Sequence, residues 1–91
     1  MAIEARIPTI LRSYTGGEKA VTGEGGTLQE LFVDLDSRHE GLRARLLGED
    51  GSLARFVNVY LNDEDVRFLG GLEAPLSDGD QVVVLPAVAG G

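Results

Sequence analysis

One short amphipathic segment constrains the fold of this chain more than any other feature. Thr27 and Glu30 have the spacing of a capping box, in which the threonine caps a helix and the glutamate bonds back to its amide. Four apolar residues then recur at helical spacing and form one stripe: Leu28, Leu31, Phe32 and Leu35. Gly41 is expected to end the helix. Because a single helix with one stripe needs a sheet to cover it, the pattern predicts a two-layer α+β domain.

The segments on either side of this helix carry the patterns of β-strands. Residues 2–7 alternate between apolar and polar side chains, and residues 19–22 are expected to return as the second strand of a hairpin. After the helix, residues 56–61 are rich in β-branched and aromatic side chains, and a small extra strand is expected around residues 66–68. Residues 81–85 form the last predicted strand, which Pro86 ends.

Glycine, asparagine and aspartate mark the connections between these elements. Residues 23–26 are predicted to form a loop, and residues 62–65 and 78–80 to form turns. Residues 42–47 are compatible with a further helical turn, whereas residues 48–51 have the composition of a loop.

The resulting order of elements is ββαββ with a small extra strand. The first and last strands would be central and parallel, joined by a crossover that contains the helix. This is the β-grasp, or ubiquitin-like, arrangement, a mixed sheet packed on one main helix. We expect the β-grasp domain to span residues 1–86 and a flexible C-terminal tail to span residues 87–91.

Size, charge and composition narrow the function classes. A chain of 91 residues forms one small domain with little room for an active-site cleft besides its core. The net charge of −7 repels phosphate backbones, so a basic protein surface suits this chain better than nucleic acid does. The absence of cysteine excludes disulfides, thiolate metal sites and iron–sulfur clusters. Because the sequence has neither a long apolar run nor a signal-peptide pattern at its start, we expect a cytoplasmic protein that does not bind membranes.

The residue sets of common catalytic sites are missing from the sequence. His39, the only histidine, falls near the predicted end of the helix, where the dipole favours an imidazole in a structural role. The acidic residues at 63–65 and 78–80 lack the spacing of a calcium loop and are expected to form turns. Neither a nucleophile elbow nor a phosphate-binding loop is present. We therefore expect no enzyme activity, no metal site and no cofactor bound by this chain.

The glycine pair at residues 90–91 differs from the other glycine pairs because it follows a strand, a proline and a run of small residues. The tail can extend about 17 Å at roughly 3.4 Å per residue, enough to enter a narrow channel in a partner: Ala87, Val88, Ala89, Gly90 and Gly91. Glycines without Cβ atoms let that partner close around the end of the chain. A carboxylate at Gly91 is a poor electrophile, so acyl chemistry there requires an ATP-using enzyme. An ordinary frayed terminus is the alternative.

The alternation of side chains between the two faces of each strand predicts a surface on which such a partner docks. In the last strand, polar Gln81 indicates that Val83 and Leu85 face outward, which leaves the valines between them for the core. The same alternation in residues 56–61 turns Phe56 and Tyr60 toward solvent. An apolar patch of these four residues would be unusual unless a partner covered it, although one or two of them can instead pack under a loop.

This pattern of strands, helix and tail resembles a known family. Residues 78–91 (DGDQVVVLPAVAGG) are similar to the C-terminal end of the ThiS/MoaD sulfur carriers. The resemblance covers nearly the whole chain. It is strongest to the CysO-type carriers of actinobacterial cysteine biosynthesis, through residues 7–12, 15–17, 55–60 and 62–68.

The resemblance implies a series of reactions that partner proteins carry out on the tail. An adenylating enzyme of the ubiquitin-activating-like ThiF/MoeB type would use ATP to activate Gly91, which a sulfur donor protein would then convert to a thiocarboxylate. An acceptor synthase would consume the sulfur. In CysO-type systems this acceptor is a pyridoxal-phosphate cysteine synthase, and a metalloprotease releases the product. The ATP and the pyridoxal phosphate belong to the partners.

Three alternatives to this function stay open at the level of the sequence. A sulfur carrier for molybdopterin, thiamin or thiosugar biosynthesis, or one shared among several pathways, would have the same tail chemistry. A ubiquitin-like protein modifier would conjugate its terminal glycine to lysines. A plain β-grasp adaptor would not use its terminus at all.

Overall fold

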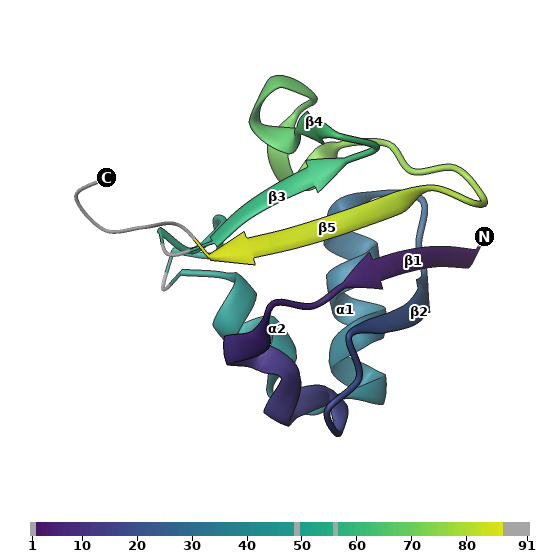
Figure 1. Ribbon diagram of the computed structural model, residues 1–91. Coiled ribbons are helices and arrows are strands. Elements are labelled where there is room, and N and C mark those ends of the chain that lie inside the picture. Colours follow the sequence, from purple (N-terminus) through teal and green to yellow (C-terminus); the bar gives the residue numbers. More distant parts are fainter. Residues whose placement is uncertain (1, 49, 56, 87–91) are drawn as a thin grey trace.

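The computed structural model describes residues 2–48, 50–55 and 57–86, which form a mixed β-sheet with two α-helices on one face (Figure 1). In these residues the strands are β1 (Ala2–Arg6), β2 (Ala20–Glu24), β3 (Val57–Leu61), β4 (Glu64–Asp65) and β5 (Gln81–Pro86). The α-helices are α1 (Leu28–Arg38) and α2 (Leu42–Leu46). The connections contain 3₁₀ helices, namely η1 (Thr9–Thr15), η2 (Val66–Phe68) and η3 (Gly71–Glu73).

Within the described residues the strand order across the sheet is β2-β1-β5-β3-β4. The first and last strands, β1 and β5, are central and parallel, with Ala5 paired to Val82. The other neighbouring strands run antiparallel. The predicted β-grasp, or ubiquitin-like, arrangement is confirmed.

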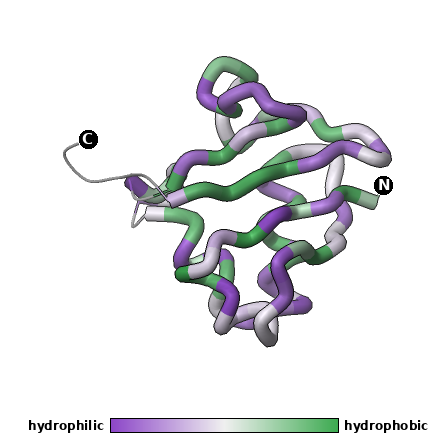
Figure 2. Tube along the Cα trace, viewed as in Figure 1, coloured by the Kyte–Doolittle hydropathy of each residue, from purple (hydrophilic) through white to green (hydrophobic). Residues whose placement is uncertain are grey.

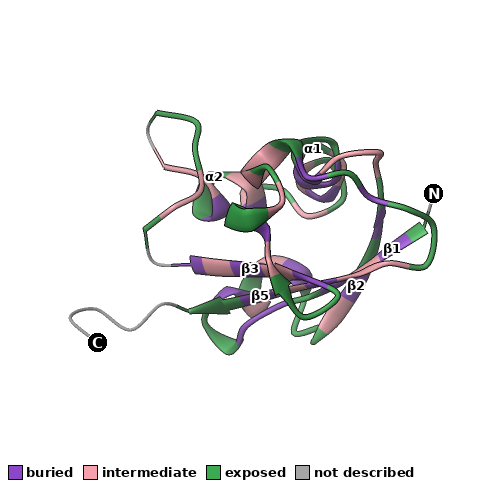
Figure 3. Cartoon of the chain, turned by 90° about the horizontal axis from the view of Figure 1, so that it is seen from above, coloured by how far each residue is buried: buried purple, intermediate pink, exposed green. Residues whose placement is uncertain are grey.

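The core lies between the sheet and the helices, which share one side of the sheet (Figure 3). The predicted stripe of α1 is confirmed, because each of its four residues is 1% exposed or less: Leu28, Leu31, Phe32 and Leu35. The residues 42–47 that the sequence left ambiguous contain α2, whose Leu42 and Leu46 are fully buried in the same cluster. Two helices therefore cover the sheet where the sequence predicted one main helix.

α1 begins where it was predicted to begin, after Thr27, but it ends a few residues before the predicted stop. The Thr27 hydroxyl accepts a hydrogen bond from the Glu30 amide at 3.2 Å, as expected for the N-cap. The Glu30 carboxylate, however, accepts from the amide of Gly26 at 2.7 Å, not from that of Thr27. The helix ends at Arg38, before Gly41, whose left-handed φ of 92° lets the chain turn into α2.

The prediction of a loop at residues 23–26 is wrong at its first two positions. β2 continues to Glu24, and Gly23 pairs with Ile3 inside the sheet. A Cβ atom at Gly23 would lie 2.8 Å from the side-chain ends of both Leu31 and Leu35. The glycine therefore serves close contact between α1 and β2, and not a turn.

The small extra strand is also displaced from its predicted position. β4 is formed by Glu64 and Asp65, whereas Val66–Phe68, predicted as the strand, form the 3₁₀ helix η2. The cause is local, because the Asp65 carboxylate accepts a hydrogen bond from the Arg67 amide at 2.9 Å and caps that helical turn. The predicted hairpin of β1 and β2 is present. Its connection, however, contains the 3₁₀ helix η1, which was not predicted.

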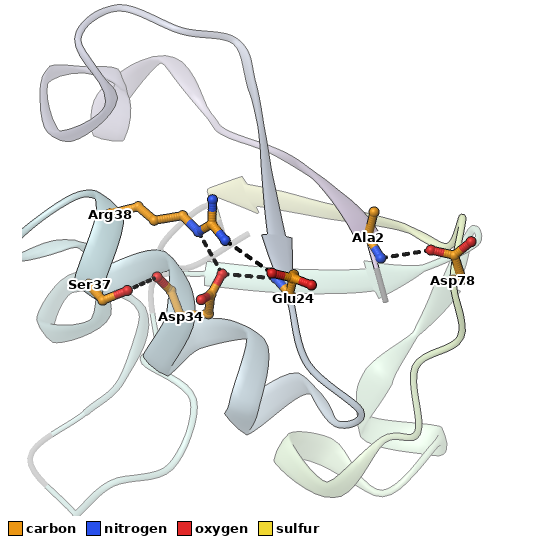
Figure 4. Close-up of polar contacts among 6 residues, drawn as sticks. All are labelled: Ala2, Glu24, Asp34, Ser37, Arg38 and Asp78. Carbon is orange, nitrogen blue, oxygen red and sulfur yellow. Dashed lines mark hydrogen bonds and ion pairs between the residues drawn. The ribbon is translucent and has the colours of Figure 1, made fainter.

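Polar contacts tie α1 to the edge of the sheet (Figure 4). The Asp34 carboxylate accepts hydrogen bonds from the Glu24 amide at 2.9 Å and from Arg38 Nε at 2.8 Å. The hydrogen bond from the Glu24 amide has the largest effect on the pKa of Asp34. Together with the contact to Arg38, it holds this pKa below its ordinary value. At the same end of the β1–β2 pair, where Ala2 lies opposite Glu24, the amide of Ala2 donates to the Asp78 carboxylate at 2.7 Å, which fixes the turn before β5.

Candidate partner-docking face

The structure describes three residues of the predicted docking patch: Tyr60, Val83 and Leu85. Phe56 and the predicted tail, Ala87 to Gly91, lie outside the described residues. The geometry that follows therefore concerns the outer face of the sheet along β3 and β5, as far as Pro86, the last residue that the structure describes.

The side chains of β5 alternate between the core and the opposite face of the sheet. Val82 and Val84 are 0% and 2% exposed, whereas Val83 is half-buried and Leu85 is 45% exposed. Figure 2 shows hydrophobic residues along most of this strand. The predicted orientation of Val83 and Leu85 is thus confirmed, while their role in docking stays a prediction.

β3 brings a third side chain to the same face. Tyr60 lies opposite Val83 in the antiparallel register, and it is half-buried between the buried residues Val59 and Leu61. Directly opposed side chains in such a pair lie within contact range. We call Tyr60, Val83 and Leu85 the outer apolar strip. Because β5 is central and continues to Pro86, the strip extends along the strand to the residue before the predicted tail.

A charged cluster borders the strip on the β4 side. Arg67 Nη2 lies 2.8 Å from the Asp65 carboxylate and 2.9 Å from the side-chain oxygen of Asn58. Hydrogen bonds from the Arg67 side chain hold the pKa of Asp65 below its ordinary value, and the same carboxylate raises the pKa of Arg67. Asp65 pairs with Tyr60 in the sheet, so these fixed charges lie beside the strip. Sequence analysis missed this cluster, because residues 66–68 were assigned to a strand.

A second polar cluster borders the strip on the β1 side. The Glu4 carboxylate accepts hydrogen bonds from Arg6 Nε and from Gln81 Nε2, each at 3.1 Å. The alternation of residues 2–7 placed Glu4 and Arg6 on the face away from the core, but nothing in the sequence showed that Gln81 would lie next to them. That juxtaposition follows from the parallel pairing of β1 with β5.

A shallow cavity of about 340 Å³ opens where η1 passes the end of β5. Leu85 and Pro86 line it from β5 and Ile10, which is 63% exposed, lines it from η1. Three basic side chains complete this wall: Arg6, Arg12 and Lys19. Sequence analysis missed the cavity, because no regular structure was predicted for residues 9–15.

The described residues contain no group of three histidine, cysteine, aspartate or glutamate side chains that could hold a metal ion. His39 caps the end of α1 and is half-buried, with its amide donating to the Leu35 carbonyl at 2.7 Å. Asp80 accepts from the amide of Ser77 at 2.8 Å within the predicted turn. In the part of the chain that the structure describes, no helix is long and apolar enough to span a membrane.

Comparison with known sequence families shows to which family this chain belongs. The sequence profile of the ThiS family matches residues 5–91. The chain belongs to the ThiS family. The match extends over both the outer apolar strip and the predicted tail, and begins within β1.

Full-length relatives of this ThiS-family chain include carriers and modifiers. The sulfur carrier protein CysO of Mycobacterium tuberculosis is 52% identical, with the alignment covering 100% of both chains. The small archaeal modifier protein 3 of Haloferax volcanii is 35% identical and is also covered completely.

Solved structures of ThiS-family proteins have the same fold. The crystal structure of M. tuberculosis CysO superimposes with a TM-score of 0.92 at 50% identity, covering 94% of this chain and 99% of that one. A chain in the crystal structure of the Amycolatopsis orientalis BexX/CysO complex gives a TM-score of 0.90 at 58% identity, with coverage of 98% and 99%. That relative therefore has been seen in complex with a partner protein.

Proposed function

We propose that this chain is a sulfur carrier protein, and not an enzyme, whose Gly91 carboxylate is converted to a thiocarboxylate that supplies sulfur for cysteine biosynthesis. The observation that carries the proposal is the 52% identity to the M. tuberculosis sulfur carrier CysO over the whole of both chains. The Gly-Gly pair at residues 90–91 and the absence of internal thiols are consistent with this role, since no cysteine can intercept an activated tail.

The chemistry starts from an unreactive group. A carboxylate carries its negative charge at neutral pH and has no leaving group, so sulfide does not displace its oxygen. In the proposed sequence the Gly91 carboxylate attacks the α-phosphorus of ATP and pyrophosphate leaves. Sulfide released by a donor protein then attacks the acyl carbon, AMP leaves, and the thiocarboxylate remains on Gly91. ATP and every catalytic group belong to the partner enzymes.

This chain contributes recognition and delivery in that scheme. The outer apolar strip offers an anchor for the adenylating enzyme, because Leu85 lies two residues before the tail and is 45% exposed. Charged clusters on both sides of the strip, around Glu4 and around Arg67, fix the orientation of a partner that covers it. The acceptor in this proposal is a pyridoxal-phosphate synthase, which receives the loaded tail.

A second candidate function is protein modification. The 35% identity to the small archaeal modifier protein 3 of H. volcanii over both full chains favours it. In that case the activated Gly91 would form an isopeptide bond with a lysine amine of another protein, with AMP as the leaving group. The fold and the docking face would serve both functions equally.

Mass spectrometry of the chain isolated from its native host distinguishes these candidates. A sulfur carrier gains about 16 mass units, the difference between one sulfur and one oxygen atom, at its C-terminal peptide. A modifier yields branched peptides in which the tail is attached to lysines of other proteins. If neither product is found in cells starved of reduced sulfur, the proposal of a carrier is wrong.

The pathway is tested separately with the loaded chain. Incubation with the host's cysteine synthase and an activated serine should consume the thiocarboxylate and leave a cysteine adduct on Gly91. Consumption by a molybdopterin, thiamin or thiosugar enzyme, with no reaction at the cysteine synthase, would assign the carrier to a different pathway.

A further inference from the structure

The cavity between η1 and the end of β5 has a charge opposite to that of the whole molecule. The chain has a net charge of −7, yet Arg6, Arg12 and Lys19 line this cavity, and among the described residues no acidic side chain does. At physiological salt, charges further than about 8 Å away are largely screened, so a partner at the cavity responds most to the charges that line it. The cavity is thus a basic site on an acidic protein.

Two of these three cations have no carboxylate partner in the part of the chain that the structure describes. Arg6 pairs with Glu4 at 3.1 Å, but the ion pairs of the described residues include neither Arg12 nor Lys19. Arg12 Nε donates to the Ile7 carbonyl at 3.1 Å, which orients the guanidinium without neutralising it. The Lys19 side chain is exposed at the residue just before the edge strand β2. Their charges are therefore available to a carboxylate from outside.

The apolar wall of the cavity is continuous with the outer apolar strip. Val83 and Leu85 line the cavity as well as the strip, and Ile10, at 63% exposure, faces them from η1. A protein that covers the strip in order to take up the tail after Pro86 would also lie over this cavity. An apolar side chain from that protein would contact Ile10 and Leu85, and flanking carboxylates would meet Arg12 and Lys19.

We propose that this basic cavity, lined by Ile10, Arg12, Lys19 and Leu85, binds an acidic segment of the adenylating enzyme. The proposal rests on the proposed function, because it extends the docking face used for activation of Gly91. The segment places one apolar side chain in the cavity and at least one carboxylate beside Lys19. Attraction between that carboxylate and Lys19 steers and orients the two proteins. Without it, the negative charge of the carrier would dominate their contact.

Lys19 is the only lysine in the sequence, which permits a direct footprinting experiment. The full chain is acetylated briefly with an amine-reactive ester, alone and in the presence of the host's ThiF/MoeB-type enzyme with ATP. Mass spectrometry of the peptide containing residue 19 then gives the rate of modification. The proposal expects that the enzyme slows acetylation of Lys19 severalfold, and an unchanged rate overturns it.

Variants test the same cavity through the kinetics of adenylation. Lys19→Glu should lower kcat/KM for adenylation by roughly three- to tenfold at low ionic strength, and this difference should shrink as salt is added. Arg12→Gln, which can still donate to the Ile7 carbonyl, should give a smaller loss. The matched control is Arg55→Glu, an exposed charge reversal outside the cavity, which should leave the rate unchanged.

The outcomes separate this inference from the function on which it rests. If the parent chain is not adenylated at all, the proposed function fails. If the parent is adenylated but Lys19→Glu and Arg55→Glu have the same kcat/KM at every salt concentration, only the basic docking site is wrong. Protection of Lys19 by the acceptor synthase without protection by the adenylating enzyme would also overturn the assignment of the partner.

Discussion

Arg6 of β1 lies directly beside Val83 of β5 in the parallel register of the sheet. On its other side Val83 faces Tyr60, so this valine is the centre of the outer apolar strip, with a cation at the edge. A substitution at Val83 therefore changes the proposed docking surface at its middle, while the core on the opposite face of β5 remains filled by Val82 and Val84.

Val83→Asp should abolish or strongly reduce adenylation while the chain stays folded. The introduced carboxylate can pair with the neighbouring Arg6, so the fold tolerates it, but the docking enzyme would have to bury a charge in place of an apolar side chain. Activity is measured as ATP–pyrophosphate exchange with the adenylating enzyme, and folding by circular dichroism. Val33→Asp is the matched control, because Val33 is 49% exposed on α1, across the domain from the strip. Equal activity of the two variants would show that this face does not dock the enzyme.

Deletion of Gly91 should abolish adenylation with no change in melting temperature. Removing one residue withdraws the carboxylate by about 3.4 Å, further than the alignment of a nucleophile with a bound nucleotide tolerates. Gly91→Ala keeps the carboxylate at the same chain length and should retain part of the activity, which separates reach from side-chain bulk. Unimpaired pyrophosphate exchange by the truncated chain would refute activation at Gly91.

Phe32→Ala should destabilise the domain by about 3–5 kcal/mol, because the side chain is 1% exposed at the centre of the interface between α1 and the sheet. A loss of this size is a large share of the total stability of a small domain. Urea denaturation followed by circular dichroism measures the change. Val33→Ala, next in sequence but half-exposed, should change stability by only about 0.5 kcal/mol or less. Similar effects of the two substitutions would contradict the assigned face of α1.

The helical spacing of apolar residues in α1 and the alternation of side chains in β5 made the layers of this fold predictable. The spacing of Leu28, Leu31, Phe32 and Leu35 gave the buried face of α1, and the alternation along residues 81–85 gave the outward face of β5. Both patterns depend only on how many residues separate side chains that share a surface. The same reasoning predicted the parallel central strands, since a helix-containing crossover joins them.

Features that depend on contacts between distant residues were not predictable in this way. Gly23 was assigned to a loop because glycines cluster there, yet its role is set by the approach of Leu31 and Leu35 from the helix. The 3₁₀ helix at residues 66–68 begins at a side-chain cap by Asp65. The composition of residues 66–68 is typical of a strand, so this cap was not predicted. The basic cavity joins η1 to β5, two segments about seventy residues apart in the sequence, and so has no local pattern.

Gly23→Ala tests the contact between α1 and β2. The new Cβ atom would lie 2.8 Å from Leu31 Cδ1 and from Leu35 Cδ2, and both leucines are buried, so the packing must shift at both contacts. Overpacking of this kind costs about 1–3 kcal/mol. In the double variant Gly23→Ala/Leu35→Ala one of the two close contacts is removed and Leu31 can shift into the space that Leu35 leaves, so the two single destabilisations should sum to more than that of the double variant. Strictly additive free energies of unfolding would show that the close approach is not what requires glycine.

Asp34→Asn tests whether the contacts of the Asp34 carboxylate stabilise the fold through its charge. The hydrogen bond from the Glu24 amide and the contact with Arg38 favour the ionised form, and they hold the pKa of Asp34 below its ordinary value of 3.8 in the folded state. The unfolded chain therefore takes up this proton at a higher pH than the folded chain does. The stabilisation is fully present above the unfolded pKa and is lost as the pH falls from 3.8 through the folded pKa.

The asparagine of this variant can still accept a hydrogen bond from the Glu24 amide, but it has no charge for Arg38 and no proton to bind in this range. Parent and variant should accordingly differ in stability by a constant amount above about pH 5, with the parent more stable. Below pH 3.8 the difference should shrink, because protonation removes from the parent the same charge that the substitution removes from the variant. Urea midpoints of both proteins across this range measure the difference directly. A difference that stays constant or widens toward acid pH would mean that the charge of Asp34 does not contribute to holding α1 on β2.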